Sequence, residues 1–220
     1  MRDDEKKYWG LLSSLLAMLV VAPMVEYRVD ASLIVGLIFG LLLIFAVWTV
    51  SHNTRTTLVA TTLGLTLFAG NVADSWLVTN GFVKFVVMGA GCLFFAYVGG
   101  VIFRDTFYSH RVTLDTVLGA VCVYLMLGLC WGFAYGFVAQ IDPTAFPSIS
   151  ADGHLLNRFV YFSFVTLTTL GFGDIVPTTA ATRGLVMLEA IVGQIYLTVL
   201  VGRLIGLHLS HEQRMRPRHD

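Results

Sequence analysis

The chain carries little charge. Lys, Arg, Asp and Glu make up 13% of its 220 residues, well below the roughly 25% of an average soluble domain. Acidic and basic side chains cancel to a formal net charge of zero, so the composition provides no overall basic charge for holding nucleic acid. The scarcity of charge excludes an ordinary soluble domain, and no nucleic-acid partner is expected.

Cysteine is also scarce. The three cysteines, Cys92, Cys122 and Cys130, all lie inside apolar runs, where a free cysteine behaves as a small hydrophobic side chain. Their number and spacing imply neither a disulfide framework nor a metal site. No cofactor is expected.

Apolar residues are abundant instead. Hydrophobic side chains account for 56% of the chain, and the mean hydropathy of +0.78 indicates an integral membrane protein. A spanning helix needs about 20 apolar residues to cross a hydrocarbon core of about 30 Å. Runs of this kind predict six transmembrane helices, over residues 9–25, 31–50, 56–78, 82–103, 114–139 and 183–207.

The third run is the least apolar of the six. Polar side chains within a bilayer usually face protein rather than lipid. We therefore expect this helix to pack inside a group formed by the first four helices. Its polar residues are Thr57, Thr61, Thr62, Thr66, Asn71 and Asp74.

Residues 158–168 are too few to span and lead directly into Thr169-Leu170-Gly171-Phe172-Gly173. They predict a re-entrant helix, whose following loop is tolerated at membrane depth only where protein surrounds it. Glycine at alternate positions lets the backbone take mirror-related dihedral angles in turn, which aims successive carbonyl groups the same way. A row of carbonyl oxygens facing one axis can replace the water shell of a cation.

Residues 161–174 read Tyr-Phe-Ser-Phe-Val-Thr-Leu-Thr-Thr-Leu-Gly-Phe-Gly-Asp. This pattern resembles the pore helix and filter of the potassium-channel pore-loop superfamily. Pro177 and Arg183 also stand where this family places a proline and a basic residue. The resemblance implies an all-α membrane protein with six transmembrane helices, a re-entrant pore helix and a selectivity-filter loop, assembled as a homotetramer. It implies K+ as the permeant ion and the only bound metal.

The same resemblance assigns roles to individual residues. Oxygen rings would come from the Thr169 hydroxyl and from the carbonyls of residues 169–172 in four chains. The negative end of the pore-helix dipole would favour a cation waiting below the filter. The filter residues are Thr169, Leu170, Gly171, Phe172 and Gly173; Phe162, Val165, Thr166 and Thr168 belong to the pore helix, and Asp174 and Tyr161 form the outer mouth.

Four residues depart from the family pattern. Phe172 and Phe162 replace the usual tyrosine and tryptophan, so no hydroxyl-to-indole hydrogen bond braces the filter and packing must do so. Val165 stands where some bacterial members carry glutamate. We therefore expect Asp174 to hydrogen-bond Tyr161 instead. Leu170 is bulkier than the usual valine.

The last apolar run contains a glycine near its middle, Gly193. The family places a gating hinge at this position, whereas close helix packing is the alternative, and the sequence leaves both open. Glu189 is the one acid within this run; it is either part of a functional site or hydrogen-bonded to the pore helix. Steps of three and four residues predict a cavity-lining stripe of Gln194, Leu197, Val201 and Ile205.

Three regions follow from this organisation. Residues 1–111 form a four-helix transmembrane domain, residues 112–210 the pore domain, and residues 211–220 a short basic cytoplasmic tail. A voltage sensor moves several arginines along one helix, but the fourth run has only Lys84 and Arg104, one at each end. Conventional voltage gating is therefore not expected. Anionic lipid is a possible partner of the tail arginines, Arg214, Arg216 and Arg218.

Basic residues also predict the orientation, because cytoplasmic loops are enriched in Lys and Arg. An even number of spans places both termini on one side. We expect that side to be the cytoplasm, with the filter facing outward from the cell (inner) membrane. The cytoplasmic set is Arg2, Lys6, Lys7, Arg55, Arg104, Arg111, Arg203, Arg214, Arg216 and Arg218, and the outer set is Arg28, Lys84, Arg158 and Arg183.

Three other functions fit parts of the sequence. Gly171-Phe172-Gly173-Asp174 also matches the Gly-x-Gly-Asp signature of intramembrane aspartyl proteases. That mechanism needs a second aspartate in the membrane, and the candidates Asp74 and Asp115 both lie near helix ends. A weakly selective cation channel keeps the pore without the selectivity, and a transporter is disfavoured because no inverted repeat is visible. The protein is not expected to be an enzyme.

Overall fold

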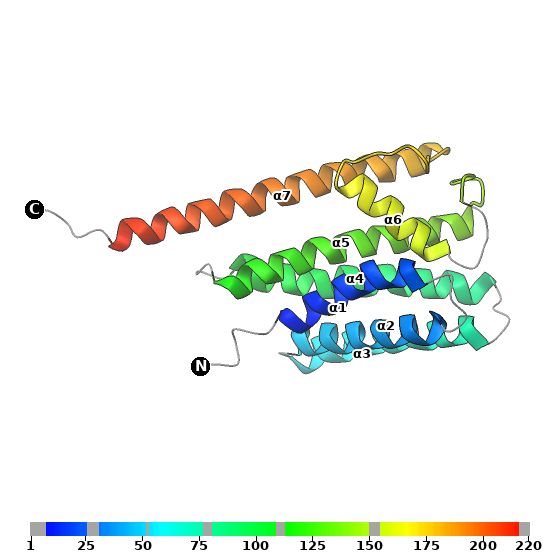
Figure 1. Ribbon diagram of the computed structural model, residues 1–220, viewed down its shortest axis with the longest axis horizontal. Coiled ribbons are helices and arrows are strands. Elements are labelled where there is room, and N and C mark those ends of the chain that lie inside the picture. The colour runs from blue at the N-terminus through cyan, green and yellow to red at the C-terminus, as the bar shows by residue number, and fades with distance from the viewer. Residues whose placement is uncertain are drawn as a thin grey trace, which may run out of the picture.

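The chain is all-helical wherever the computed structural model describes it, namely over residues 8–25, 31–51, 53–76, 81–108, 113–149 and 155–215 (Figure 1). These ranges contain no strand, so the predicted all-α class is confirmed. The helices are α1 (Trp9–Val25), α2 (Ala31–Val50), α3 (Thr54–Trp76), α4 (Gly81–Tyr108), α5 (Leu114–Ile141), α6 (Leu155–Leu167) and α7 (Ala180–Met215).

In the described part of the chain, three helices are long and apolar enough to cross a membrane: α4, α5 and residues Ala180–Arg203 of α7. Shorter apolar stretches in the described part of the chain are Trp9–Val21, Gly36–Val50 and Leu155–Leu167. The last of these is α6, whose 13 residues rise only about 20 Å. It is too short to span, as its sequence predicted.

Successive long helices alternate in direction. In Figure 1, α1, α3 and α5 run one way and α2, α4 and α7 run the other, while α6 crosses obliquely between α5 and α7. The beginning of α1 and the end of α7 consequently lie at the same end of the molecule.

The centre of the molecule is the antiparallel pair α4 and α5. Because α4 ends at Tyr108 and α5 begins at Leu114, the connection is short and the two helices pack along their length. Phe95 of α4 meets Phe133 of α5 with ring centroids 5.5 Å apart. The buried core around this pair is continuous through α1, α2, α3 and α7, and of the first four helices α1 and α4 pack directly on α5.

The third helix does not pack inside the group, contrary to the expectation from its polar residues. It contacts α2 and α4 and lies at the outer edge of the molecule (Figure 1). Its threonine hydroxyls donate hydrogen bonds to carbonyl oxygens one turn earlier in the same helix. Thr61 donates to the Thr57 carbonyl at 2.6 Å, and Thr66 donates to the Thr62 carbonyl at 3.0 Å. A threonine satisfied in this way can face lipid. The side chains of Asn71 and Asp74 lie outside the described residues.

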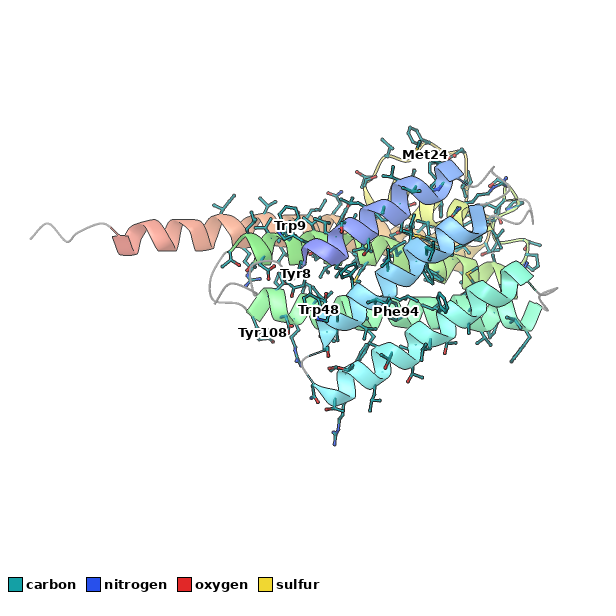
Figure 2. The ribbon with its side chains drawn as sticks, turned by 60° about the horizontal axis from the view of Figure 1, so that its bottom comes forward. Tyr8, Trp9, Met24, Trp48, Phe94 and Tyr108 are labelled. Atoms are coloured by element: carbon teal, nitrogen blue, oxygen red, sulfur yellow. The ribbon has the colours of Figure 1, made fainter. Side chains whose placement is uncertain are left out.

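Three exposed tryptophan and tyrosine side chains lie at one end of the molecule. Figure 2 places Trp9, Trp48 and Tyr108 near the start of α1 and the ends of α2 and α4, and they are 50%, 60% and 78% exposed. Tryptophan and tyrosine are enriched at the surfaces of a bilayer. This level therefore fits one membrane interface.

The last helix is longer than predicted. It has 36 residues, Ala180–Met215, and its final turns extend beyond the other helices in both views (Figures 1 and 2). The predicted span ended at residue 207 and the predicted tail began at residue 211, so both boundaries fall inside one continuous helix. The side chains of Arg214, Arg216 and Arg218 lie outside the described residues.

Candidate functional site

The short helix α6 lies against two glycines of α5. A Cβ atom at Gly128 would come within 2.6 Å of the Phe164 ring, and one at Gly132 within 2.9 Å of the Val160 backbone. Real side chains do not approach so closely, so α6 sits where only glycine allows it. The helix is thereby held obliquely between α5 and α7.

The backbone after α6 alternates in handedness. Thr169, Gly171 and Gly173 have φ angles of 59°, 58° and 78°. Such alternation is what the spaced glycines of residues 169–173, here called the filter segment, predicted. Thr169 is unexpected, since among the described residues it is the one non-glycine with positive φ. For a β-branched residue this conformation is strained, at a cost of about 1–3 kcal/mol.

The end of α6 holds the filter segment through backbone hydrogen bonds. The Val165 carbonyl accepts from the amides of Leu170 and Gly171 at 2.9 and 3.2 Å, and the Thr166 carbonyl accepts from Thr169 at 2.9 Å. Thr168 is exposed and its hydroxyl bonds the Phe164 carbonyl at 2.6 Å. Amides of the filter segment therefore turn toward α6, while within the described residues no backbone amide donates to the carbonyls of residues 169–172.

Asp174, directly after the filter segment, interacts with Tyr161 of α6. This interaction with the Asp174 carboxyl group raises the pKa of the Tyr161 phenol above its usual range, and desolvation acts in the same direction. The phenol therefore stays protonated and able to donate. The hydrogen bond expected from the sequence stays a prediction.

The chain after Asp174 is tied to the turn that follows α5. Thr178 donates its amide to the Ala145 carbonyl at 3.1 Å and its hydroxyl to the Thr144 carbonyl. The Arg183 guanidinium donates to the Pro177 carbonyl at 3.3 Å. Sequence reasoning missed this anchor, because nothing local indicates which carbonyl Thr178 reaches.

Gly193 of α7 lies against the last turn of α6. A Cβ atom there would come within 2.8 Å of both the carbonyl oxygen and a side-chain carbon of Leu167. Close packing is therefore sufficient to explain this glycine, which the sequence left open between packing and a hinge.

Glu189 of α7 is fully buried. Its carboxyl group is hydrogen-bonded to the hydroxyls of Tyr135 of α5 and Ser163 of α6. The expected bond to the pore helix is thus present, through a serine. Tyr135 lies 54 positions away in sequence, so no sequence pattern pointed to it.

The remaining predicted residues of α7 face away from the chain. Glu189, Gly193 and Tyr196 form its buried face, and the Tyr196 hydroxyl donates to the Ala120 carbonyl at 2.6 Å. Side chains on the opposite face have no cover within the described chain. The predicted cavity stripe, Gln194, Leu197, Val201 and Ile205, is exposed throughout.

Comparison with known proteins identifies this arrangement. The family model described as "Ion channel" matches residues 123–207, which run from α5 through α6 and the filter segment into α7. Two-pore potassium channel 4 of Arabidopsis thaliana is 34% identical over 94 residues. The chain belongs to the potassium-channel pore-loop superfamily. Protein LctB of Bacillus caldotenax is 30% identical over 103 residues.

Both matches cover part of this pore-loop protein. They take in 41% and 44% of the chain, and the chain spans 29% of the Arabidopsis protein and 75% of LctB. The matched residues 123–207 correspond to the family described as an ion channel. The ion that it conducts and the assembly that it forms are considered below.

The back of the filter segment is open in a single chain of this pore-loop protein. Leu170 and Phe172 are 58% and 64% exposed, and they line an apolar cavity of about 410 Å³. Phe162 packs elsewhere, 5.1 Å from the Tyr135 ring and 5.5 Å from Phe146. The packing that should brace Phe172 does not come from Phe162 of the same chain. Other walls of the cavity are Met18, Leu19, Phe39, Leu42, Leu129 and Phe133.

The two aspartates that a protease would need are not brought together in the described part of the chain. Asp174 is engaged with Tyr161, whereas Asp115 lies in the first turn of α5 and accepts from the Tyr8 amide at 3.4 Å. The other candidate, Asp74, has a side chain outside the described residues. No group of three or more His, Cys, Asp or Glu side chains forms a metal-type cluster among the residues described.

Proposed function

We propose that this protein is a K+-selective channel that conducts passively through a filter formed by residues 169–173 of four chains. The observation that carries the proposal is the alternating positive φ at Thr169, Gly171 and Gly173, with the neighbouring amides turned toward α6. Carbonyl oxygens on one side of such a segment, repeated four times around an axis, form the rings that replace the water shell of K+.

The surfaces left open by one chain support a homotetramer. Leu170 and Phe172 are exposed behind the filter segment, and Met187, Leu188 and Ile191 of α7 are 61%, 54% and 55% exposed. Four copies around one axis, which the closed oxygen rings require, would cover these side chains. In the proposed assembly α5, α6 and α7 surround the axis, and α1 to α4 lie at the periphery as spanning helices.

The proposed orientation places both termini in the cytoplasm and Asp174 at the outer mouth. It rests on the distribution of Lys and Arg in the sequence. The aromatic level at Trp9, Trp48 and Tyr108 then marks the cytoplasmic interface of a cell (inner) membrane. The end of α7 extends into the cytoplasm, where its basic residues meet anionic lipid.

A weakly selective cation channel is the second candidate. Its support is the bulkier Leu170 and the cavity behind it, because a filter that is loosely braced can adjust its width to Na+. Both functions share the same pore, so the measured ratio of K+ to Na+ flux separates them.

The test is ion flux through the purified protein in liposomes. We expect K+ uptake to exceed Na+ uptake strongly and to be blocked by Ba2+, a divalent ion of similar radius to K+. Equal K+ and Na+ fluxes would favour the weakly selective channel. Absence of any cation flux at every condition tested would contradict both functions.

A further inference from the structure

Glu189 lies where the three helices of the pore region converge. It belongs to α7, and its carboxyl group reaches Tyr135 of α5 and Ser163 of α6. The titratable groups that face it from α5 are Tyr124, Cys130 and Tyr135. From α6 it meets Ser163, which does not titrate. The interactions described for this carboxyl group therefore include no cation.

The hydrogen bonds around Ser163 indicate where the protons lie. The Ser163 hydroxyl is 2.8 Å from the Gly128 carbonyl oxygen and also bonded to the Glu189 carboxyl. A hydroxyl has one proton to donate, and a carbonyl can only accept. If Ser163 donates to Gly128, the proton between Ser163 and Glu189 must come from Glu189.

A neutral carboxylic acid satisfies every group in this chain. In that state Tyr135 donates to one carboxyl oxygen, the protonated oxygen on the other side would donate to the Ser163 hydroxyl, and Ser163 would donate to the Gly128 carbonyl. If the carboxyl group were ionised, the single Ser163 proton would face two acceptors, and only one of them could receive its hydrogen bond. Ionisation would also place a buried charge among uncharged partners, which is strongly unfavourable.

We propose that Glu189, as a neutral carboxylic acid, is a positioning residue that fixes α6 between α5 and α7 and so sets the geometry of the filter. Ser163 lies two residues before Val165, whose carbonyl holds the amides of Leu170 and Gly171. A shift of α6 at Ser163 is therefore transmitted directly to the filter segment. This inference rests on the proposed channel function. In it, Glu189 supports the filter segment through α6, whereas Phe162 packs elsewhere and does not.

The first experiment compares Glu189→Gln with Glu189→Ala in liposome flux. An amide donates and accepts at the positions of a carboxylic acid, so the Gln variant keeps the three hydrogen bonds and should conduct K+ with unchanged selectivity. The Ala variant should lose about tenfold in K+ over Na+ selectivity, as expected for the loss of a buried hydrogen-bonded group. The proposal would be overturned if the Gln variant lost as much K+ over Na+ selectivity as the Ala variant.

A serine pair provides the matched control. Ser163→Ala should reproduce the loss seen in Glu189→Ala. Ser14→Ala should not, because Ser14 is also buried but bonds the Leu11 carbonyl of its own helix. Equal effects of the two serine variants would show that Ser163 acts only through general stability and would overturn the proposal.

A spectroscopic readout separates this inference from the channel function itself. The infrared difference spectrum of wild type minus Glu189→Gln should contain the carbonyl stretch of a protonated carboxylic acid at neutral pH. If that band is present but no flux is seen in any variant, the channel function fails and the protonation stands. If flux is seen and the band is absent, the neutral acid is refuted.

Discussion

Thr169, Gly171 and Gly173 adopt left-handed backbone at alternate positions, and the two glycines do so without steric cost. A Cβ atom at either glycine would meet nothing within 4 Å in a single chain. Crowding therefore does not explain why these residues are glycine. The φ angle does, because a side chain disfavours the left-handed region by about 1–2 kcal/mol.

We accordingly expect Gly171→Ala and Gly173→Ala to abolish or strongly reduce K+ flux in liposomes. The penalty occurs in each of four chains and turns carbonyls away from the axis. Gly100→Ala is the control, since Gly100 also has open space around its Cβ position but lacks a positive φ. Intact K+ flux in both filter variants would show that the filter assignment is wrong.

The Tyr161 hydroxyl is a second single group that we expect to affect conduction. Tyr161→Phe keeps the ring and removes the hydroxyl that interacts with Asp174, so the outer mouth loses its expected hydrogen bond to α6. Single-channel currents should decay faster or become less selective for K+. Tyr108→Phe serves as the control because Tyr108 is 78% exposed and far along α4. Unchanged single-channel behaviour of Tyr161→Phe would count against this role.

At the scale of helices, the pore region is assembled by close approach. Gly128 and Gly132 allow α6 to pack closely against α5, and Gly193 allows α6 to pack closely against α7. The hydroxyl of Ser163 reaches Gly128 and Glu189 because these approaches are short. Backbone proximity and buried polar contacts thus fix the position of α6 together.

Gly193→Ala separates packing from a hinge. A methyl group at 2.8 Å from the Leu167 carbonyl oxygen must push α6 and α7 apart, which costs about 1–3 kcal/mol. The midpoint of thermal unfolding in detergent should fall in this variant. Gly202→Ala is the control in the same helix, since nothing lies within 4 Å of its Cβ position. An unchanged unfolding midpoint with altered open probability would favour the hinge.

At the scale of the whole molecule, one chain leaves its pore-facing surface uncovered. The exposed face of α7 and the open back of the filter segment need partners, and four copies around one axis provide them in a closed ring. Native mass spectrometry of protein in detergent should therefore give a tetramer. A monomer or dimer as the conducting form would contradict the proposed filter.

The first four helices are not expected to sense voltage. Lys84 and Arg104 are the basic residues of α4, and moving one charge across 100 mV supplies only about 2.3 kcal/mol. Open probability in a planar bilayer should hardly change between negative and positive potentials. Steep activation by voltage would mean that other charges move through the membrane field.

The sequence by itself determined the elements of this protein. Apolar runs of spanning length predicted the helices, and residues 9–25 and 31–50 match α1 and α2, whereas α7 continues past its predicted end to Met215. The spaced glycines gave the alternating backbone of the filter segment. Both properties are local. The length of an apolar run and the wide range of φ angles open to glycine depend only on residues close together in the sequence.

Only the tertiary structure decided how those elements meet. It placed α3 at the outer edge, gave Thr169 a conformation that a β-branched residue disfavours, and brought Tyr135, Ser163 and Glu189 together. The partners of a buried group depend on the spacing and rotation of helices that are distant in sequence. Periodicity predicts which face of a helix is apolar, but contact distances decide which residue lies against it.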